Sequence, residues 1–289
     1  MPRLAYIDGR FIPLAEAVVS VEDRGFQFAD GIYEVCAVMN GRLLDWPRHQ
    51  ARLEKNLASL AIVPPMPAQA LAIVARRLVA ANRVMQALLY IQVTRGVAKR
   101  DHGFPAGAKP TLVMTVRPFD FAQRVGQQAR GVAVISQPDQ RWARCDIKTT
   151  GLLANVLAKQ AARGAGAFEA WLVGDDGSVR EGGSTNAWIV DAAGTVVTHP
   201  LSPHILPGVM RAAIIDAARA AGLGMVERPF SLDEARGAAE AFLSSTTAPV
   251  LPVVSLDGRP VADGRPGAVT TQLAALMWRH IADQTGYRP

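Results

Sequence analysis

Cysteine is nearly absent from this sequence of 289 residues, which contains only Cys36 and Cys145. Two cysteines are too few for a disulfide framework, so the small disulfide-stabilised domains of secreted proteins are excluded and a reducing compartment is favoured. Long hydrophobic runs are also missing: no stretch approaches the roughly 18 apolar residues of a membrane-spanning helix, and residues 1–10 lack the apolar core of a signal peptide. We therefore expect a cytoplasmic protein with no membrane partner.

Aromatic residues are scarce as well, at 6%, and the net charge of +6 comes from scattered arginines rather than from a basic run. Proteins that bind single-stranded nucleic acid combine a positive groove with aromatic stacking platforms. Because both features are missing, we expect no nucleic-acid partner. Single arginines in apolar surroundings are instead typical of receptors for small anions such as carboxylates and phosphate.

Lysine is the rarer of the two permanently basic residue types, since only five of the 31 are lysines. Arginine can serve wherever charge alone is needed, but a guanidinium stays protonated and forms no Schiff base. Lys148 lies in the segment RWARCDIKTTGLLANVLAKQ, directly before a predicted helix that Thr149 or Thr150 would cap. A site that needs a primary amine would explain this lysine, whereas a surface lysine retained by chance is the ordinary alternative.

Hydrophobic residues are plentiful, at 49% of the sequence, so a large core can form. The length of the chain suits two domains. Two pairs of short apolar runs are joined by Asp8-Gly9 and Asn40-Gly41, which supply the positive φ of tight hairpin turns. Two amphipathic helical patterns and two β-rich runs follow. The pattern predicts a small α+β domain over residues 1–117.

Residues 118–128 are irregular and polar, which is typical of an interdomain linker. Strand and helix patterns then alternate over residues 129–289, and Ser231 with Glu234 forms a capping box at the start of one helix. This arrangement predicts a larger α/β domain, barrel-like, that follows the first. The fold class expected for the whole chain is therefore α/β.

Several features outside the Lys148 segment are each weak alone. Glu181 ends a predicted strand, Pro207-Gly208 opens a helix whose backbone N–H groups can bind an anion, and a run of hydroxyls follows at residues 244–247. Arg52 adds a permanent positive charge, although a nearby acid could be its only partner. An imine-forming amine, a carboxylate for a ring nitrogen, and a helix start with hydroxyls for a phosphate are together the parts of a pyridoxal 5′-phosphate site.

The chain resembles the class IV aminotransferases, which depend on pyridoxal phosphate, and within them the D-amino-acid aminotransferases. The resemblance runs from about Tyr6 to Gly264. Six ordered stretches carry it: Asp23–Val35, His49–Asn56, Thr94–Pro105, Arg144–Gln160, Glu181–Asn186 and Ser245–Val253.

The resemblance implies a two-domain fold with the cofactor in the cleft between the domains, and a homodimer as the working unit. It implies that Lys148 is the Schiff-base lysine and that Glu181 pairs with the pyridine nitrogen. It assigns the phosphate to Arg52, Ser245, Thr246 and the backbone amides of Val209 and Met210, and the face of the cofactor ring to Leu206. It assigns the substrate α-carboxylate to Tyr33, Arg100 and His102, the last two reaching in from the neighbouring subunit. No metal is implied.

Three residues depart from the family pattern. Gly183 stands where relatives often have serine, Met210 replaces a common threonine, and Ala29 replaces a usual glycine. The first two remove hydroxyl groups near the cofactor, so they bear on how tightly it binds rather than on the chemistry.

The activity that the resemblance implies is transfer of the amino group from D-alanine and other D-amino acids to 2-oxoglutarate. Alternatives of the same fold are a branched-chain L-amino-acid aminotransferase, an aminodeoxychorismate lyase and an amine transaminase. The Arg100/His102 pair argues against the branched-chain enzyme. A non-catalytic anion-binding module is the alternative of a different class, and Lys148 argues against it.

Overall fold

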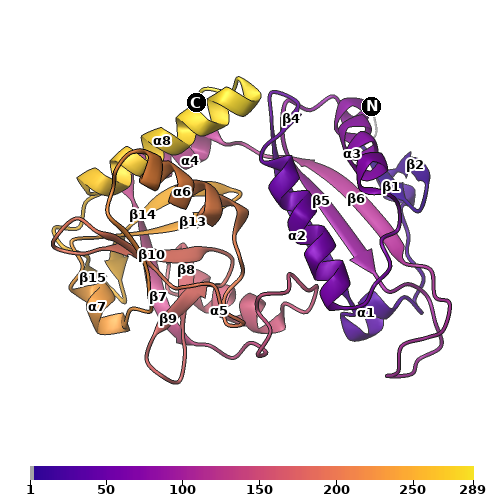
Figure 1. Cartoon of the computed structure of the whole chain (residues 1–289), viewed down its shortest axis with the longest axis horizontal. Coiled ribbons are helices and arrows are strands. Elements are labelled where there is room, and N and C mark those ends of the chain that lie inside the picture. The colour runs from indigo at the N-terminus through magenta and orange to yellow at the C-terminus, as the bar shows by residue number, and fades with distance from the viewer. Residues whose placement is uncertain (1–2) are drawn as a thin grey trace. The chain divides into compact units, whose positions relative to one another are not determined.

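The computed structural model describes residues 3–289, which divide into two compact units (Figure 1). Unit 1 contains residues 3–120, 147–151 and 283–287, and unit 2 contains residues 121–146, 152–282 and 288–289. None of the helices in these residues combines the length and the apolar character that crossing a bilayer requires.

Unit 1 is built on an antiparallel sheet of six strands in the order β2-β1-β6-β5-β3-β4. The strands are β1 (Leu4–Ile7), β2 (Arg10–Pro13), β3 (Gly31–Met39), β4 (Arg42–Leu43), β5 (Gln86–Thr94) and β6 (Thr111–Pro118). Asp8, Gly9, Asn40 and Gly41 all have positive φ at the two hairpin turns. The structure therefore confirms both predicted hairpins.

Two long helices cover one face of this sheet, α2 (Trp46–Ser59) and α3 (Ala68–Asn82). Successive side chains of a strand point to opposite faces, so Ile32 and Cys36 of β3 join the core with Leu53 and Leu57 of α2. Tyr33, which alternates with them, lies on the opposite face. The short elements of unit 1 are η1 (Leu14–Glu16) and α1 (Arg24–Phe28).

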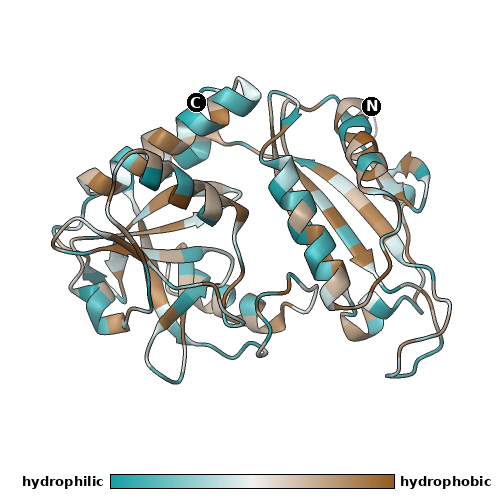
Figure 2. Ribbon diagram, viewed as in Figure 1, coloured by the Kyte–Doolittle hydropathy of each residue, from teal (hydrophilic) through white to brown (hydrophobic). Residues whose placement is uncertain are grey.

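Unit 2 contains a mixed sheet of nine strands in the order β12-β11-β10-β13-β14-β7-β8-β9, with β15 paired to β14. The strands are β7 (Val132–Pro138), β8 (Glu169–Val173), β9 (Val179–Gly182), β10 (Asn186–Val190), β11 (Val196–Thr198), β12 (Met225–Glu227), β13 (Glu240–Ser245), β14 (Ala248–Leu256) and β15 (Arg259–Pro260). The helices are α4 (Ala122–Arg130), α5 (Leu153–Gly164), α6 (Val209–Ala220), α7 (Leu232–Arg236) and α8 (Ala268–Thr285). Trp171, Ile189, Phe230 and Leu243 lie in its core, and Figure 2 shows hydrophobic residues along the central strands of both units. The mixture of helices and sheets confirms the predicted fold class.

Two details differ from the division expected from the sequence. Helix α4 occupies most of the range 118–128. Its inward-facing residues are half-buried and largely polar, and Gln128 donates to the carbonyl of Val250, so the helix lacks the apolar stripe by which sequence reasoning finds helices. The short segment Ile147–Gly151 packs with unit 1, although it lies within the range 129–289 expected for the second domain. Ile147 is buried in the core of unit 1, and the N–H of Thr150 donates to the carbonyl of Gly31 at 3.1 Å.

Candidate active site

Lys148 is held against strand β3 by its main chain. Its carbonyl accepts a hydrogen bond from the N–H of Tyr33 at 2.9 Å, and its Nζ lies 4.1 Å from the centre of the Tyr33 ring. Within residues 3–289 no carboxylate pairs with this ammonium group. An amine that is half-buried, fixed by its backbone and not tied to an acid suits a nucleophile.

The helix that follows Lys148 does not have the predicted cap. Helix α5 starts after Leu152, whose side chain makes no capping bond. The Thr149 hydroxyl instead accepts from the N–H of Gly151 at 2.9 Å, and the Thr150 hydroxyl donates to the carbonyl of Ala29 at 3.2 Å. The prediction of a threonine cap was wrong, because these hydroxyls find partners in a local turn and on the chain beside β3.

Glu181 is a buried carboxylate on strand β9, with 4% of its surface exposed. The N–H of Leu206 lies 3.1 and 3.0 Å from its two oxygens, and the side-chain amide of Asn186 donates to Oε2 at 3.0 Å. The Arg141 guanidinium forms an ion pair with Oε1. Glu181, Leu206 and Asn186 therefore form one hydrogen-bonded group in unit 2.

Arg141 is a functional candidate that the sequence reasoning did not name. Its Nε and Nη2 also contact the carboxylate of Asp139, at 2.9 and 2.8 Å. Burial acts to lower the pKa of Arg141, but the hydrogen bond to Asp139 and the charge of Glu181 outweigh it and raise the pKa above its usual value. A permanent cation thus lies against Glu181. The only feature of the sequence that could have pointed to Arg141 is its position seven residues before Lys148.

The start of α6 offers backbone donors without a side-chain cap. Gly208 precedes the helix, and the first N–H groups of any helix have no partner inside it. A Cβ on Gly208 would lie 2.0 Å from Oδ1 of Asn186, so glycine is required there. The same asparagine donates to the carbonyl of Leu206 at 3.1 Å. Asn186 thereby connects the start of α6 with Glu181, and the predicted helix opening at Pro207-Gly208 is confirmed.

The hydroxyl run of residues 244–247 is divided between the core and a turn. Strands β10 and β13 pair Asn186 with Ser244, whose hydroxyl accepts from the indole of Trp188 at 2.9 Å. Ser245 ends β13, and its hydroxyl accepts from the N–H of Ala248 at 3.2 Å. Thr246 is half-buried in the turn that follows. Ser245 and Thr246 therefore belong to the same unit as Val209, Met210 and Leu206.

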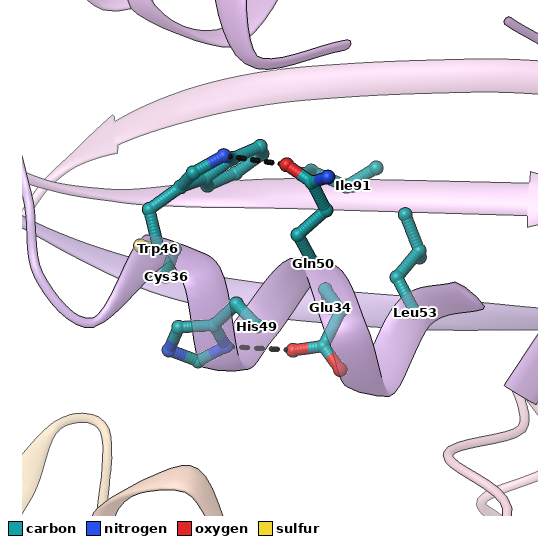
Figure 3. Close-up of a pocket in the computed structure, with 7 residues that line it drawn as sticks. All are labelled: Glu34, Cys36, Trp46, His49, Gln50, Leu53 and Ile91. Carbon is teal, nitrogen blue, oxygen red and sulfur yellow. Dashed lines mark hydrogen bonds and ion pairs between the residues drawn. The ribbon is translucent and has the colours of Figure 1, made fainter. Parts of the chain in front are cut away.

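Arg52 lies in unit 1, on α2, and forms a buried two-point ion pair. Its Nε and Nη2 bind the two oxygens of Glu34 at 2.7 and 2.9 Å. His49, one helical turn earlier, lies 2.8 Å from the same carboxylate (Figure 3). Burial raises the pKa of Glu34, but Arg52 and His49 outweigh it and lower the pKa to about 2. Glu34 and His49 were also missed, although His49 and Arg52 have the i, i+3 spacing of one helix face.

The three residues expected to bind the substrate carboxylate are only partly brought together. Arg100 and His102 both lie beside Phe28, with the Arg100 guanidinium 4.6 Å and the His102 ring centre 5.3 Å from the centre of its ring. No hydrogen bond or ring contact joins Tyr33 to either of them in residues 3–289.

The comparisons with known proteins place these features in a family. Residues 31–256 match the family model described as amino-transferase class IV. The chain is a class IV aminotransferase. This aminotransferase is 38% identical to a D-alanine aminotransferase of Bacillus licheniformis over 96% of its own length and 97% of that protein. A D-alanine aminotransferase of Staphylococcus aureus is also 38% identical, with the same coverage of both chains.

Solved structures support the fold. The branched-chain amino acid aminotransferase of Escherichia coli superimposes with a TM-score of 0.88, over 99% of this aminotransferase and 96% of that chain. An aminotransferase of Mycobacterium tuberculosis in its PLP-bound form superimposes with a TM-score of 0.81, over 99% of this chain and 100% of that one. Their sequences are 22% and 23% identical to this one, so the likeness concerns the fold alone.

The aminotransferase depends on pyridoxal phosphate, as its family does, and its residues fit that cofactor. The Lys148 amine has no acid paired with it in residues 3–289, and Glu181 is a buried carboxylate that can face a ring nitrogen. The glycine-bounded start of α6 and the hydroxyls of Ser245 and Thr246 are donors of the kind that bind a phosphate, and all of them lie in unit 2.

Proposed function

We propose that this aminotransferase transfers the amino group of D-alanine and related D-amino acids to 2-oxoglutarate, which yields 2-oxo acids such as pyruvate, and D-glutamate. The observation that carries the proposal is the 37–38% identity, over nearly the whole chain, with D-alanine aminotransferases of three genera. The Arg100 and His102 pair, held beside Phe28, supports it as a receptor for a carboxylate.

Lys148 is the residue that acts on the reacting carbon. Its Nζ would hold the cofactor covalently and, as a free amine, would take the proton from the substrate Cα. When bound, pyridoxal phosphate supplies an electron-withdrawing ring that accepts the electron pair released from Cα. The carbonyl and ring contacts to Tyr33 hold the lysine side chain in place for this transfer.

Glu181 holds a proton on the pyridine nitrogen of the cofactor. Its charge is supported by the Arg141 guanidinium and by the hydrogen bonds from Leu206 and Asn186. A carboxylate that accepts several such bonds favours the charged form. Arg141 is therefore a positioning residue, which acts through Glu181.

The phosphate binds to donors that do not change during the reaction. We assign it to the amides of Val209 and Met210, the hydroxyls of Ser245 and Thr246, and the Arg52 guanidinium that Glu34 orients. Leu206 packs against the ring of the cofactor.

Tyr33, Arg100 and His102 bind the substrate α-carboxylate and so decide which face of Cα points at Lys148. We propose that the enzyme works as a cytoplasmic homodimer in which the partner subunit supplies the arginine and the histidine of this group. Gel filtration with light scattering checks the dimer, and a monomer that retains full turnover would contradict it.

A donor screen tests the proposed specificity. D- and L-alanine, D- and L-glutamate, and D- and L-leucine are each supplied with 2-oxoglutarate, or with pyruvate for the glutamates, and the products are resolved by chiral chromatography. We expect D-alanine to be used and L-leucine to be a poor donor. Efficient use of L-leucine with no use of D-alanine would favour the branched-chain L-specific alternative instead.

A further inference from the structure

The face of the unit 1 sheet opposite α2 and α3 carries a small group of polar and aromatic side chains beside Lys148. Tyr33, beneath the Lys148 amine, is directly opposite Gln92 in the strand pairing, and Val35 is opposite Tyr90. All four side chains are half-buried. Directly opposite residues of an antiparallel pair have Cβ atoms about 5 Å apart, so Gln92 is a close neighbour of the ring over which the amine lies.

Hydrogen bonding and ring contacts orient Gln92. The Tyr90 hydroxyl donates to Oε1 of Gln92 at 2.6 Å, and the rings of Tyr90 and Tyr33 stack at 5.7 Å. Burial and the neighbouring Tyr33 raise the pKa of Tyr90 to about 12, so the phenol keeps its proton at neutral pH. The carbonyl oxygen of Gln92 is thus occupied, while no hydrogen-bond partner for its Nε2 is found in residues 3–289.

We propose that Nε2 of Gln92 donates a hydrogen bond to the side-chain carboxylate of dicarboxylic substrates, and so determines how well D-glutamate and 2-oxoglutarate are used relative to alanine and pyruvate. The inference rests on the proposed function, because it takes Lys148 as the base that removes the Cα proton. A base must approach Cα to roughly 3 Å, which places the substrate above Tyr33 and beside Gln92.

The dimensions of the sheet separate Gln92 from the three arginines that the strand pairing places on the same face, Arg10, Arg42 and Arg117. Arg10 lies three strands away, roughly 14 Å, and Arg42 is opposite Met39, whose partner Gln86 is six residues from Gln92. In 2-oxoglutarate, the carbon that receives the amino group and the distal carboxylate are joined by three C–C bonds of about 1.5 Å each. Arg117 is paired with Leu88, four residues along β5 from Gln92. Four residues of a strand span roughly 13 Å, which is beyond the reach of a five-carbon acid held at Lys148.

A neutral amide also suits an exchange between two unlike substrates. The same face must receive a methyl group from alanine and a carboxylate from glutamate. A buried cation would be left without a partner when alanine binds, and this costs much more free energy than the loss of one hydrogen bond by a neutral amide. Gln92 can therefore favour the dicarboxylate without excluding alanine.

The test compares two substitutions at Gln92 with the same change elsewhere on the strand. In Gln92→Leu, we expect the ratio of kcat/KM for D-glutamate to that for D-alanine to fall about tenfold or more, as for loss of a hydrogen bond to a charged group. Gln92→Glu keeps the shape, adds a like charge, and should lower the ratio further. Gln86→Leu, on the same strand and face but six residues away, should leave the ratio unchanged. An unchanged ratio in both Gln92 variants would overturn the proposal.

A binding measurement separates this inference from the proposed function. Calorimetry with the pyridoxal-phosphate-loaded protein compares glutarate, a dicarboxylate, with butyrate, which lacks the second carboxylate. Gln92→Leu should weaken glutarate about tenfold more than butyrate. Selective loss of glutarate in a protein that does not use D-alanine would leave the inference standing and overturn the function. If the wild type uses D-alanine normally and Gln92→Leu weakens glutarate and butyrate equally, the proposed function stands and the inference is overturned.

Discussion

Each unit of the molecule contains a buried carboxylate paired with an arginine, and the two pairs differ in which partner is proposed to face the ligand. In unit 1, Glu34 binds Nε and Nη2 of Arg52, so the acid orients the cation. In unit 2, Arg141 is itself fixed by Asp139, and together with Asn186 and the Leu206 amide it orients Glu181. In the proposed function, the same kind of ion pair therefore presents a cation to the phosphate in one unit and an anion to the ring nitrogen in the other.

The largest expected effect concerns Lys148, the proposed nucleophile. Lys148→Arg should abolish turnover and the visible absorbance of the bound cofactor, because a guanidinium cannot bind the cofactor covalently. Lys159→Arg is the matched control, since Lys159 Nζ contacts Glu169 at 3.1 Å and the Phe168 carbonyl at 2.7 Å. Absorbance spectroscopy distinguishes them, and loss of the band in the control alone would assign the nucleophile to Lys159.

The same substitution, glutamate to glutamine, can be made in both carboxylates, Glu181 and Glu34, and its effects on the two ion pairs can be compared. Glu181→Gln should lower kcat about 100-fold or more with the cofactor still bound, because it removes electrostatic stabilisation of the reacting ring. Glu34→Gln should weaken pyridoxal phosphate about tenfold and leave pyridoxal, which lacks the phosphate, unaffected. Equilibrium dialysis with both ligands is the measurement. Equal weakening of the two ligands would show that Glu34 supports the fold rather than the phosphate contact.

Arg100 offers a contrast with both pairs, since its guanidinium lies over the ring of Phe28 and no carboxylate pairs with it in residues 3–289. Arg100→Ala should cost about 2–5 kcal/mol of substrate binding, typical of removing one partner of a desolvated charge pair. Single-turnover kinetics with D-alanine measure this loss, and the absorbance of the bound cofactor should stay intact. Unchanged kinetics would exclude Arg100 from the substrate site.

Acid should weaken unit 1 through Glu34. Its pKa is lowered from 4.5 to about 2, so the carboxylate contributes stability above pH 4.5 that is lost as the pH falls towards 2. The full contribution is about 3 kcal/mol, of which about half would be gone at pH 3. Urea unfolding at pH 5 and pH 3 should show this loss in the wild type and a smaller one in Glu34→Gln. Equal losses in both proteins would contradict it.

The smallest expected effect is at the start of α6. Met210 presents no hydroxyl to the phosphate, so Met210→Thr should bind the cofactor more tightly by about 1 kcal/mol, the gain of one hydrogen bond. Because Met210 is 3% exposed, a melting curve of the variant without cofactor controls for a change in packing. Equal or weaker cofactor affinity in equilibrium dialysis, with unchanged melting, would reject the idea.

Local signals predicted the parts of the molecule that depend on neighbouring residues. The Asp8-Gly9 turn and the start of α6 after Gly208 follow from backbone preferences. The Ser231 hydroxyl accepts from the N–H of Glu234 at 3.0 Å, as the capping pattern predicted.

Partners distant in the sequence could not be found in this way. Glu34 and Arg52 are 18 residues apart and Arg141 and Glu181 are 40 apart, and only the strand pairing and the course of the loops bring them together. The position of Lys148 in unit 1 depends on the backbone bond to Tyr33, which has no sequence signature. The roles given to the site residues rest on the family resemblance and stay predictions, and the resemblance did not name Glu34, His49 or Arg141.

The alternation of β3 and β5 separates two tasks that a protein engineer would want to change independently. Ile32 and Cys36 build the hydrophobic core, while Tyr33 and Gln92 occupy the other face of the same sheet. If the proposed function is right, a mutant library confined to Val35, Tyr90 and Gln92 should alter the donor range of the enzyme without changing the core or the residues proposed to hold the cofactor. Substitutions on one face of the sheet can therefore be used to evolve new amino-acid preferences while its other face keeps the core intact.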